Sequence, residues 1–267
     1  MRDVSTLVVI VIVGLFAAAT FAGDSVNTNN TFKSKSFNLR VYGVAEQLEY
    51  EDILATESGQ LGGAGVEAGF KLVGPLWIEG RGEVFGGTVD HETHLAVRTP
   101  SGKWRVSDTT IQMNSEYVGG KVECDLALKF PVTSTFCLKP YVGVGSRSWT
   151  RTLDDLTYGV EEDWTTSYGL LGCGGEVGIG KIVKLFGRIE ARMPFKNSVS
   201  SKYDNYTGMA DNESEPHKDP SLYAEAGVNV SVVMASIFVE TLEFKEPAPS
   251  QQDAKTTMSG VKLGVAF

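Results

Sequence analysis

After its first 22 residues, the chain lacks any hydrophobic run long enough to form a transmembrane helix. A helix that spans a bilayer needs about 20 consecutive apolar residues, so spanning helices are excluded for the rest of the chain. The mean hydropathy of −0.06 does not exclude a membrane protein that crosses the bilayer with strands. Such strands alternate apolar and polar side chains, and this alternation averages to zero over a hydropathy window.

Cysteine is scarce, and basic residues are outnumbered. The three cysteines, Cys124, Cys137 and Cys173, are odd in number, so at least one thiol stays unpaired. The alternation described below places Cys124 and Cys173 on an apolar face, where a thiol behaves as a small hydrophobe. Cys137 faces the other way, so no disulfide is expected. With 33 acidic and 24 basic residues, the net charge is −9, which argues against a nucleic acid as partner.

The first segment has the features of an export signal. Arg2 precedes an apolar run from Leu7 to Ala19, and small residues follow at Thr20 and Ala22, as signal peptidase requires. We therefore predict a secretory signal peptide over residues 1–22. A single membrane anchor is the alternative, but the apolar run is shorter than the roughly 20 residues that a spanning helix needs.

Residues 23–35 are rich in Asn, Thr, Ser and Lys and show no periodicity, so we interpret them as a periplasmic lead-in. From residue 36 to residue 267, apolar side chains recur at every second position in separate segments, which is the period of a β-strand. Thirty glycines, many inside these segments, indicate curved strands as well as turns. The ten predicted strands are 36–50, 64–72, 77–85, 117–130, 136–147, 171–179, 184–195, 223–232, 237–245 and 260–267.

The strand pattern is very regular in most segments and poor in one. Between residues 117 and 130, one face is apolar or small, whereas the other carries four charges. In the ninth segment, Leu242 and Phe244 fall on the charged face, which predicts a β-bulge or a shifted register there. We place a tight turn at Val233 to Ser236, before this segment.

Connections alternate between short and long. The short ones include Val73-Gly74-Pro75 and Gly180 to Ile182, and the long ones are polar. Short turns at one end and long loops at the other are typical of an antiparallel up-and-down transmembrane β-barrel. We predict ten strands, with eight or twelve as alternatives, and an even number places both termini on the periplasmic side. The predicted long loops are 52–59, 90–113, 153–163, 197–220 and 247–255.

The last eight residues end on an aromatic side chain, and the apolar positions alternate up to it. Gly260, Leu263, Val265 and Phe267 resemble the terminal strand signature of bacterial outer-membrane β-barrel proteins, which acts as an insertion signal. The resemblance implies a multi-pass β-barrel in the outer membrane of a Gram-negative cell envelope. It also implies as partners the barrel-assembly machinery, periplasmic chaperones, and outer-membrane lipid with lipopolysaccharide. We expect a monomer.

The predicted inward face carries charges of both signs. A barrel of about ten strands has a narrow interior, so long charged side chains would largely fill it and pair with one another. We predict a structural plug rather than a proton or ion path, and we do not expect a wide porin-like channel. The predicted lumen network consists of Glu79, Arg81, Glu83, Lys121, Glu123, Asp125, Arg188, Glu190 and Arg192.

All three histidines lie in predicted outer regions. His91, His94 and His217 stand next to carboxylates and are candidate metal ligands or acid–base groups. A barrel of ten strands resembles the omptin proteases, in which an acidic pair faces an Asp/His pair across the barrel mouth. That resemblance implies Asp90 and Glu92 as the first pair, and His217 with Asp219 or Glu215 as the second.

The sequence context of these residues departs from omptin motifs, and a glutamate in place of an aspartate moves the carboxylate by one methylene. A lipid hydrolase would instead need a serine near a histidine at the rim. We predict no cofactor. We expect a non-enzymatic outer-membrane barrel whose surface loops bind or adhere, or which supports the envelope. The alternatives are a hydrolase at the rim and a narrow channel.

Overall fold

The computed structural model describes residues 36–52, 55–98, 104–154, 159–204, 212–214, 217–245 and 254–267. The predicted signal peptide over residues 1–22 and the lead-in over residues 23–35 lie outside the described residues. Every regular element in the described part is a β-strand. None of the described residues form a helix that is both long and apolar enough to span a membrane.

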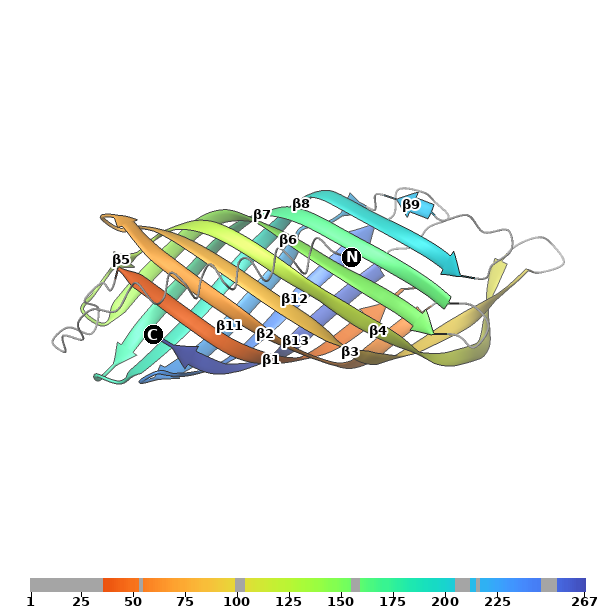
Figure 1. Cartoon of the computed structure of the whole chain (residues 1–267), viewed down its shortest axis with the longest axis horizontal. Coiled ribbons are helices and arrows are strands. Elements are labelled where there is room, and N and C mark those ends of the chain that lie inside the picture. Colours follow the sequence, from red (N-terminus) through yellow and green to blue (C-terminus); the bar gives the residue numbers. More distant parts are fainter. Residues whose placement is uncertain are drawn as a thin grey trace.

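Ten long strands form one closed antiparallel barrel within the described part of the chain (Figure 1). The ring closes because β13 pairs with β12 on one side and with β1 on the other. The prediction of a ten-stranded antiparallel barrel is therefore confirmed. The long strands are β1 (Phe37–Glu51), β2 (Ala55–Val73), β3 (Leu76–Arg98), β4 (Trp104–Leu128), β6 (Phe136–Asp154), β7 (Gly159–Ile179), β8 (Val183–Asp204), β11 (Ser221–Val230), β12 (Val233–Lys245) and β13 (Ala254–Ala266).

Three short strands lie outside this ring. They are β5 (Phe130–Pro131), β9 (Asn212–Ser214) and β10 (His217–Lys218), which pair with β6, β8 and β12 respectively. In Figure 1 the long strands cross the barrel obliquely, and the β3–β4 hairpin projects at the end opposite to the C-terminus.

The end that holds the C-terminus has short turns. Gly74, Gly180 and Ser231 adopt positive φ angles of 57°, 67° and 57°, which allow the chain to reverse within a few residues. The backbone amide of Phe267 donates to the carbonyl of Leu39 at 2.8 Å, so both ends of the barrel sequence lie here. The predicted turn at Val233 to Ser236 was wrong, because the turn lies just before β12 and those residues already belong to that strand.

The outer face of the barrel near this end is an apolar band. Its side chains are exposed, although they are aliphatic or aromatic, and they alternate with inward residues along most of the long strands. Such a face is suited to lipid rather than water. We call this surface the apolar band; it includes Val41, Val84, Val118, Leu126, Val142, Val144, Leu171, Ile189, Met193, Leu222, Ile237, Val261 and Leu263.

Beyond the apolar band, the strands continue as an extension with polar outward side chains. β3 has 23 residues and β4 has 25, whereas a strand that only crosses the membrane needs about 9–11. The two strands stay paired as far as Arg98 and Trp104. The prediction of loops over 52–59, 90–113, 153–163 and 197–220 was therefore wrong for most of these residues. Backbone pairing does not require an apolar face, so hydrophobic alternation did not reveal these strands.

The predicted bulge in the ninth strand was also wrong. β12 pairs with β11 and with β13 without a register shift. Leu242 points inward because it packs with Met258, Trp149 and Trp164 in an apolar layer inside the extension. The interior is therefore charged along only part of β12, which is why apolar Leu242 can face inward without a bulge.

Several glycines in the strands lie directly opposite tyrosines. Tyr42 pairs with Gly65, and Tyr141 pairs with Gly172. At both glycines a β-carbon would overlap the ring of the opposite tyrosine. These glycines therefore allow large rings to lie flat against the neighbouring strand inside the barrel, which adds to the curvature expected from the sequence.

Candidate functional site

At the level of the apolar band, the interior is filled by ion pairs. All nine residues of the predicted lumen network pair with at least one opposite charge. Glu190 lies at the centre with 0% exposure. It accepts hydrogen bonds from Arg81, from Arg192 at 3.0 Å and from the Tyr141 hydroxyl at 2.8 Å. Because each charge has a partner, the desolvation of the buried ions is offset by mutual attraction.

A second carboxylate, Glu240, lies closer to the extension and is shared by several cations. Arg147 donates to it at 2.8 Å, Arg192 donates to it as well, and the ammonium of Lys121 lies 3.9 Å away. The space left within the charged layer near Arg81 and Tyr223 is a cavity of about 10 Å³. This volume is about what one water molecule requires.

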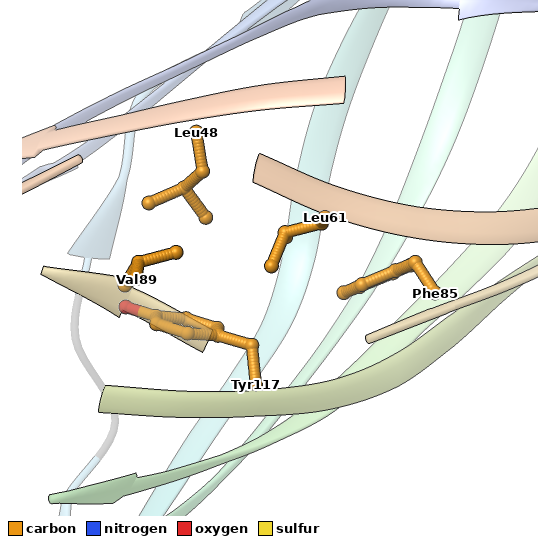
Figure 2. Close-up of a cluster of buried hydrophobic side chains, with 5 residues drawn as sticks. All are labelled: Leu48, Leu61, Phe85, Val89 and Tyr117. Atoms are coloured by element: carbon orange, nitrogen blue, oxygen red, sulfur yellow. The ribbon is translucent and has the colours of Figure 1, made fainter. Parts of the chain in front are cut away.

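Above the charged layer, the interior becomes aromatic. A cavity of about 50 Å³ opens there, and we call it the mouth pocket. It is bounded by side chains from seven different strands, so it lies inside the barrel rather than on its outer surface. Figure 2 shows a cluster of five buried side chains from β1, β2, β3 and β4, of which Leu48, Phe85 and Tyr117 also line the pocket. The lining residues are Leu48, Tyr50, Phe85, Tyr117, Arg147, Trp149, Arg151, Glu162, Trp164, Leu242, Thr256 and Met258.

Two tryptophans form one side of the mouth pocket. Trp149 on β6 and Trp164 on β7 are direct cross-strand partners, and their rings stack with centroids 5.6 Å apart and 3° between their planes. The indole N–H of Trp164 donates to Glu162 at 3.2 Å, and Glu162 also accepts from Arg151 at 3.0 Å. Hydrogen bonds from Trp164 to Glu162 and from Arg151 to Glu162 therefore hold the aromatic wall in place.

A buried carboxylate, Glu57, fixes Arg151 from behind. The guanidinium of Arg151 donates to Glu57, which also accepts hydrogen bonds from Ser115 at 2.9 Å and from the hydroxyl of Tyr117. His91 Nδ1 lies 2.6 Å from the same carboxylate. Burial alone would raise the pKa of Glu57, but the hydrogen bonds from His91, Tyr117 and Arg151 and the charge of Arg151 lower it to about 2. Glu57 is therefore an ionised anchor in the extension.

The mouth pocket is open at one side and buried at its floor. Tyr50, Arg151 and Trp164 are half-buried, whereas Phe85 and Arg147 are only 7% and 4% exposed. At the floor, the Nε and Nη1 atoms of Arg147 are buried without a hydrogen-bond partner. A buried guanidinium with unused N–H groups can bind a further acceptor.

The structure separates the acidic candidates in β3 from the histidine beside them. His91 points into the barrel, whereas Asp90 is exposed on the outer face of the strand. The cross-strand partners of Asp90 are Ser58 and Asn114. Glu92 is half-buried, two positions from Asp90. His94 is also half-buried, and its Nδ1 atom has no hydrogen-bond partner.

The remaining candidates lie on the other side of the barrel. Asp219 is half-buried and borders a cavity of about 10 Å³ together with Arg147, Arg192 and Glu240. The backbone of His217, in β10, pairs with Lys245, in β12. The side chain of His217 and the whole of Glu215 lie outside the described residues. Among the side chains that the structure describes, no three His, Cys, Asp or Glu residues come together as a metal site.

The sequence reasoning missed the residues that build the mouth pocket. Glu57, Trp149, Arg151 and Trp164 all lie in, or within a few residues of, the predicted loops 52–59 and 153–163. The strand period could have found them, because Trp149 and Arg151 continue the inward positions of Arg147 along β6.

No protein-family model and no curated protein sequence matches the chain. Among solved structures, the barrel is similar to the outer-membrane protease OmpT from Escherichia coli, with a TM-score of 0.59 and 8% identity over 92% of this chain and 98% of that one. The translocator domain of the autotransporter NalP from Neisseria meningitidis has a TM-score of 0.44 and 10% identity, over 97% and 96% of the two chains. The outer membrane protein OprG from Pseudomonas aeruginosa has a TM-score of 0.43 and 11% identity, over 87% and 96%. The similarity to OmpT shows that the chain has the fold of a bacterial outer-membrane β-barrel.

Proposed function

We propose that this protein is a non-enzymatic barrel of the outer membrane that binds ligands at the cell surface through its extension. The observation that carries the proposal is the division of the interior into a layer of buried ion pairs, with a cavity of about 10 Å³, and an open mouth pocket above it. The apolar band supports insertion in a membrane. The end of the barrel that has the short turns also holds the start of the first strand, near Leu39, and the end of the last strand, next to Phe267, which supports a periplasmic position for it.

The charged layer argues against the channel alternative. A solute would have to displace side chains such as Glu190 and Arg192, which are bonded to several partners and have 0% and 2% exposure. Breaking such buried pairs leaves uncompensated charges and is unfavourable by several kcal/mol. The lumen therefore suits a plug better than a pathway.

The Glu57 cluster argues against a hydrolase built on Ser115 and His91. A serine nucleophile has to donate its proton to a histidine and be accessible to substrate. Ser115 is 0% exposed and donates instead to Glu57, which also binds His91. The cluster therefore serves to hold Arg151 at the pocket.

Surface labelling tests the orientation on which the proposal depends. In a variant in which Cys124, Cys137 and Cys173 are replaced with alanine, Asp90→Cys places a thiol on the extension and Lys181→Cys places one in a short turn. We expect a membrane-impermeant maleimide to label Asp90→Cys on intact cells. Lys181→Cys should be labelled only after the outer membrane is permeabilised.

Both thiols lie at exposed positions, so each serves as a control for the accessibility of the other. Labelling of Lys181→Cys alone on intact cells would place the extension in the periplasm and rule out surface binding. Equal labelling of both before permeabilisation would contradict insertion across the membrane.

A further inference from the structure

We propose that the mouth pocket binds a small aromatic carboxylate, with the carboxylate on Arg147 at the floor and the ring against Trp149 and Trp164. This inference rests on the proposed function, because it names the ligand class of the same extension. It is carried by three features of the pocket: the unused N–H groups of Arg147, the aromatic walls and the spacing between the two.

Arg147 supplies the charge that selects an anion. Its Nη2 atom donates to Glu240 at 2.8 Å, while Nε and Nη1 are buried without partners. Glu240 also accepts from Arg192 and lies 3.9 Å from Lys121, so Arg147 shares its one carboxylate partner with other cations. A carboxylate from a ligand would satisfy the unused N–H groups of Arg147.

The other cation of the pocket does not compete for the anion. Arg151 already binds Glu57 through Nε and Nη2 and Glu162 through Nη1. Its guanidinium lies 5.6 Å from the centre of the Tyr50 ring and forms part of the wall. Arg147 is therefore the guanidinium of the pocket that can take a new acceptor.

The walls favour an aromatic ring over a sugar. The lining contains five aromatic side chains with Leu48, Leu242 and Met258, and its polar members Arg151, Glu162 and Tyr117 are already bonded to one another or to Glu57. A sugar needs several polar partners for its hydroxyl groups, and burying them unpaired is unfavourable. An aromatic ring, in contrast, gains from contact with the tryptophan faces.

The spacing also suits a short ligand. Arg147 and Trp149 are two positions apart on the same face of β6, which is about 7 Å along a strand. One ring with its carboxylate spans that distance. The cavity of about 50 Å³ is smaller than the roughly 150 Å³ that encloses a benzene ring, so part of the ligand stays in the open mouth.

The experiment uses the full-length folded barrel in detergent micelles and three probes. Benzoate carries both the ring and the charge, benzamide carries the ring alone, and hexanoate carries the charge on an aliphatic chain. Saturation-transfer NMR of each probe, with titration, gives the three dissociation constants. We expect benzoate to bind about tenfold more tightly than either of the others, since each lacks one of the two contacts.

Three variants test the position of the ligand. Met258→Trp fills the pocket without changing a charge and is expected to abolish the difference between benzoate and the other probes. Trp164→Ala removes a wall and should weaken benzoate binding about tenfold. Trp77→Ala is the matched control, because Trp77 is buried at the opposite end of the barrel and should leave binding unchanged. The shift in gel mobility on boiling shows that each variant is folded.

Benzoate binding that persists in Met258→Trp would overturn the inference, and so would equal binding of all three probes. A failure of the inference is distinguishable from a failure of the proposed function. Absence of benzoate binding with surface labelling of Asp90→Cys would reject only the ligand class. Absence of that labelling would reject the surface role itself.

Discussion

Replacing Glu190 with methionine is expected to lower the free energy of unfolding by roughly 3–5 kcal/mol, because it leaves buried cations without their shared partner. Glu190 bonds to Arg81 and Arg192 and lies 3.8 Å from Arg188. The measurement is the denaturant midpoint of the barrel refolded into lipid vesicles, compared with the midpoint of the unchanged protein.

A second substitution shows whether charge imbalance is the cause. Glu190→Met combined with Arg192→Met removes one charge of each sign and leaves Glu123 on Arg81 and Glu240 on Arg147, so it should be more stable than Glu190→Met alone. Lys202→Met is the surface control, because Lys202 pairs with Glu161 and Asp163 in an exposed position and should contribute little. A Glu190→Met barrel as stable as the Lys202→Met barrel would contradict the plug described above.

The second large effect is expected on the outer face. Ile237 is 65% exposed in the middle of the apolar band of β12. Ile237→Arg should destabilise the barrel in vesicles by about 2–4 kcal/mol, as expected for an arginine that faces lipid near the bilayer midplane. The same denaturant titration in vesicles measures it.

Thr241→Arg is the matched control for this substitution. Thr241 lies on the same strand and face, four positions further toward the extension, and is also β-branched. Its expected effect is about 0–1 kcal/mol, because an arginine there reaches the interface or water. Equal destabilisation by the two substitutions would mean that the apolar band extends to Thr241. A larger effect at Thr241 would place Thr241, and not Ile237, near the bilayer midplane.

The barrel itself was predictable because lipid and the lumen impose opposite demands on successive residues. On β4, Val118 and Leu126 face outward while Lys121 and Glu123 face inward, and this contrast alone determines both strand and register. The closing strand was recognised for the same reason, since Leu263 is exposed and Lys262 is buried beside Glu83.

The extension was not predictable in the same way. In the extension the outer face meets water and the interior is polar or aromatic, so successive side chains do not differ in hydropathy as they do in the membrane. The sequences around Asp90 and His91 and around Glu162 and Asp163 therefore resemble those of loops. The backbone still pairs there, and its hydrogen bonds leave no mark on side-chain hydropathy. The sequence predicted one rim site for the three histidines because it predicted a loop at Asp90 and His91. In the structure these two residues lie on a strand and face opposite sides of it.

The mouth pocket depends on contacts between distant segments. Glu57 and Arg151 are 94 positions apart in sequence, and no local pattern connects them. The charges of the plug were predictable as a group, but their individual pairing was not, because it depends on which strands face each other across the lumen. Arg81 with Glu190, 109 positions apart, is one example.

Planar-bilayer conductance tests the central claim most directly, namely that the charged layer closes the lumen below a binding pocket. The folded native barrel is expected to insert without conductance steps. A variant that combines Arg81→Ala, Glu190→Ala and Arg192→Ala shortens both signs of charge at the centre of the layer and should produce steps. Regular conductance steps from the native barrel, equal to those of the variant, would show an open lumen and contradict the account.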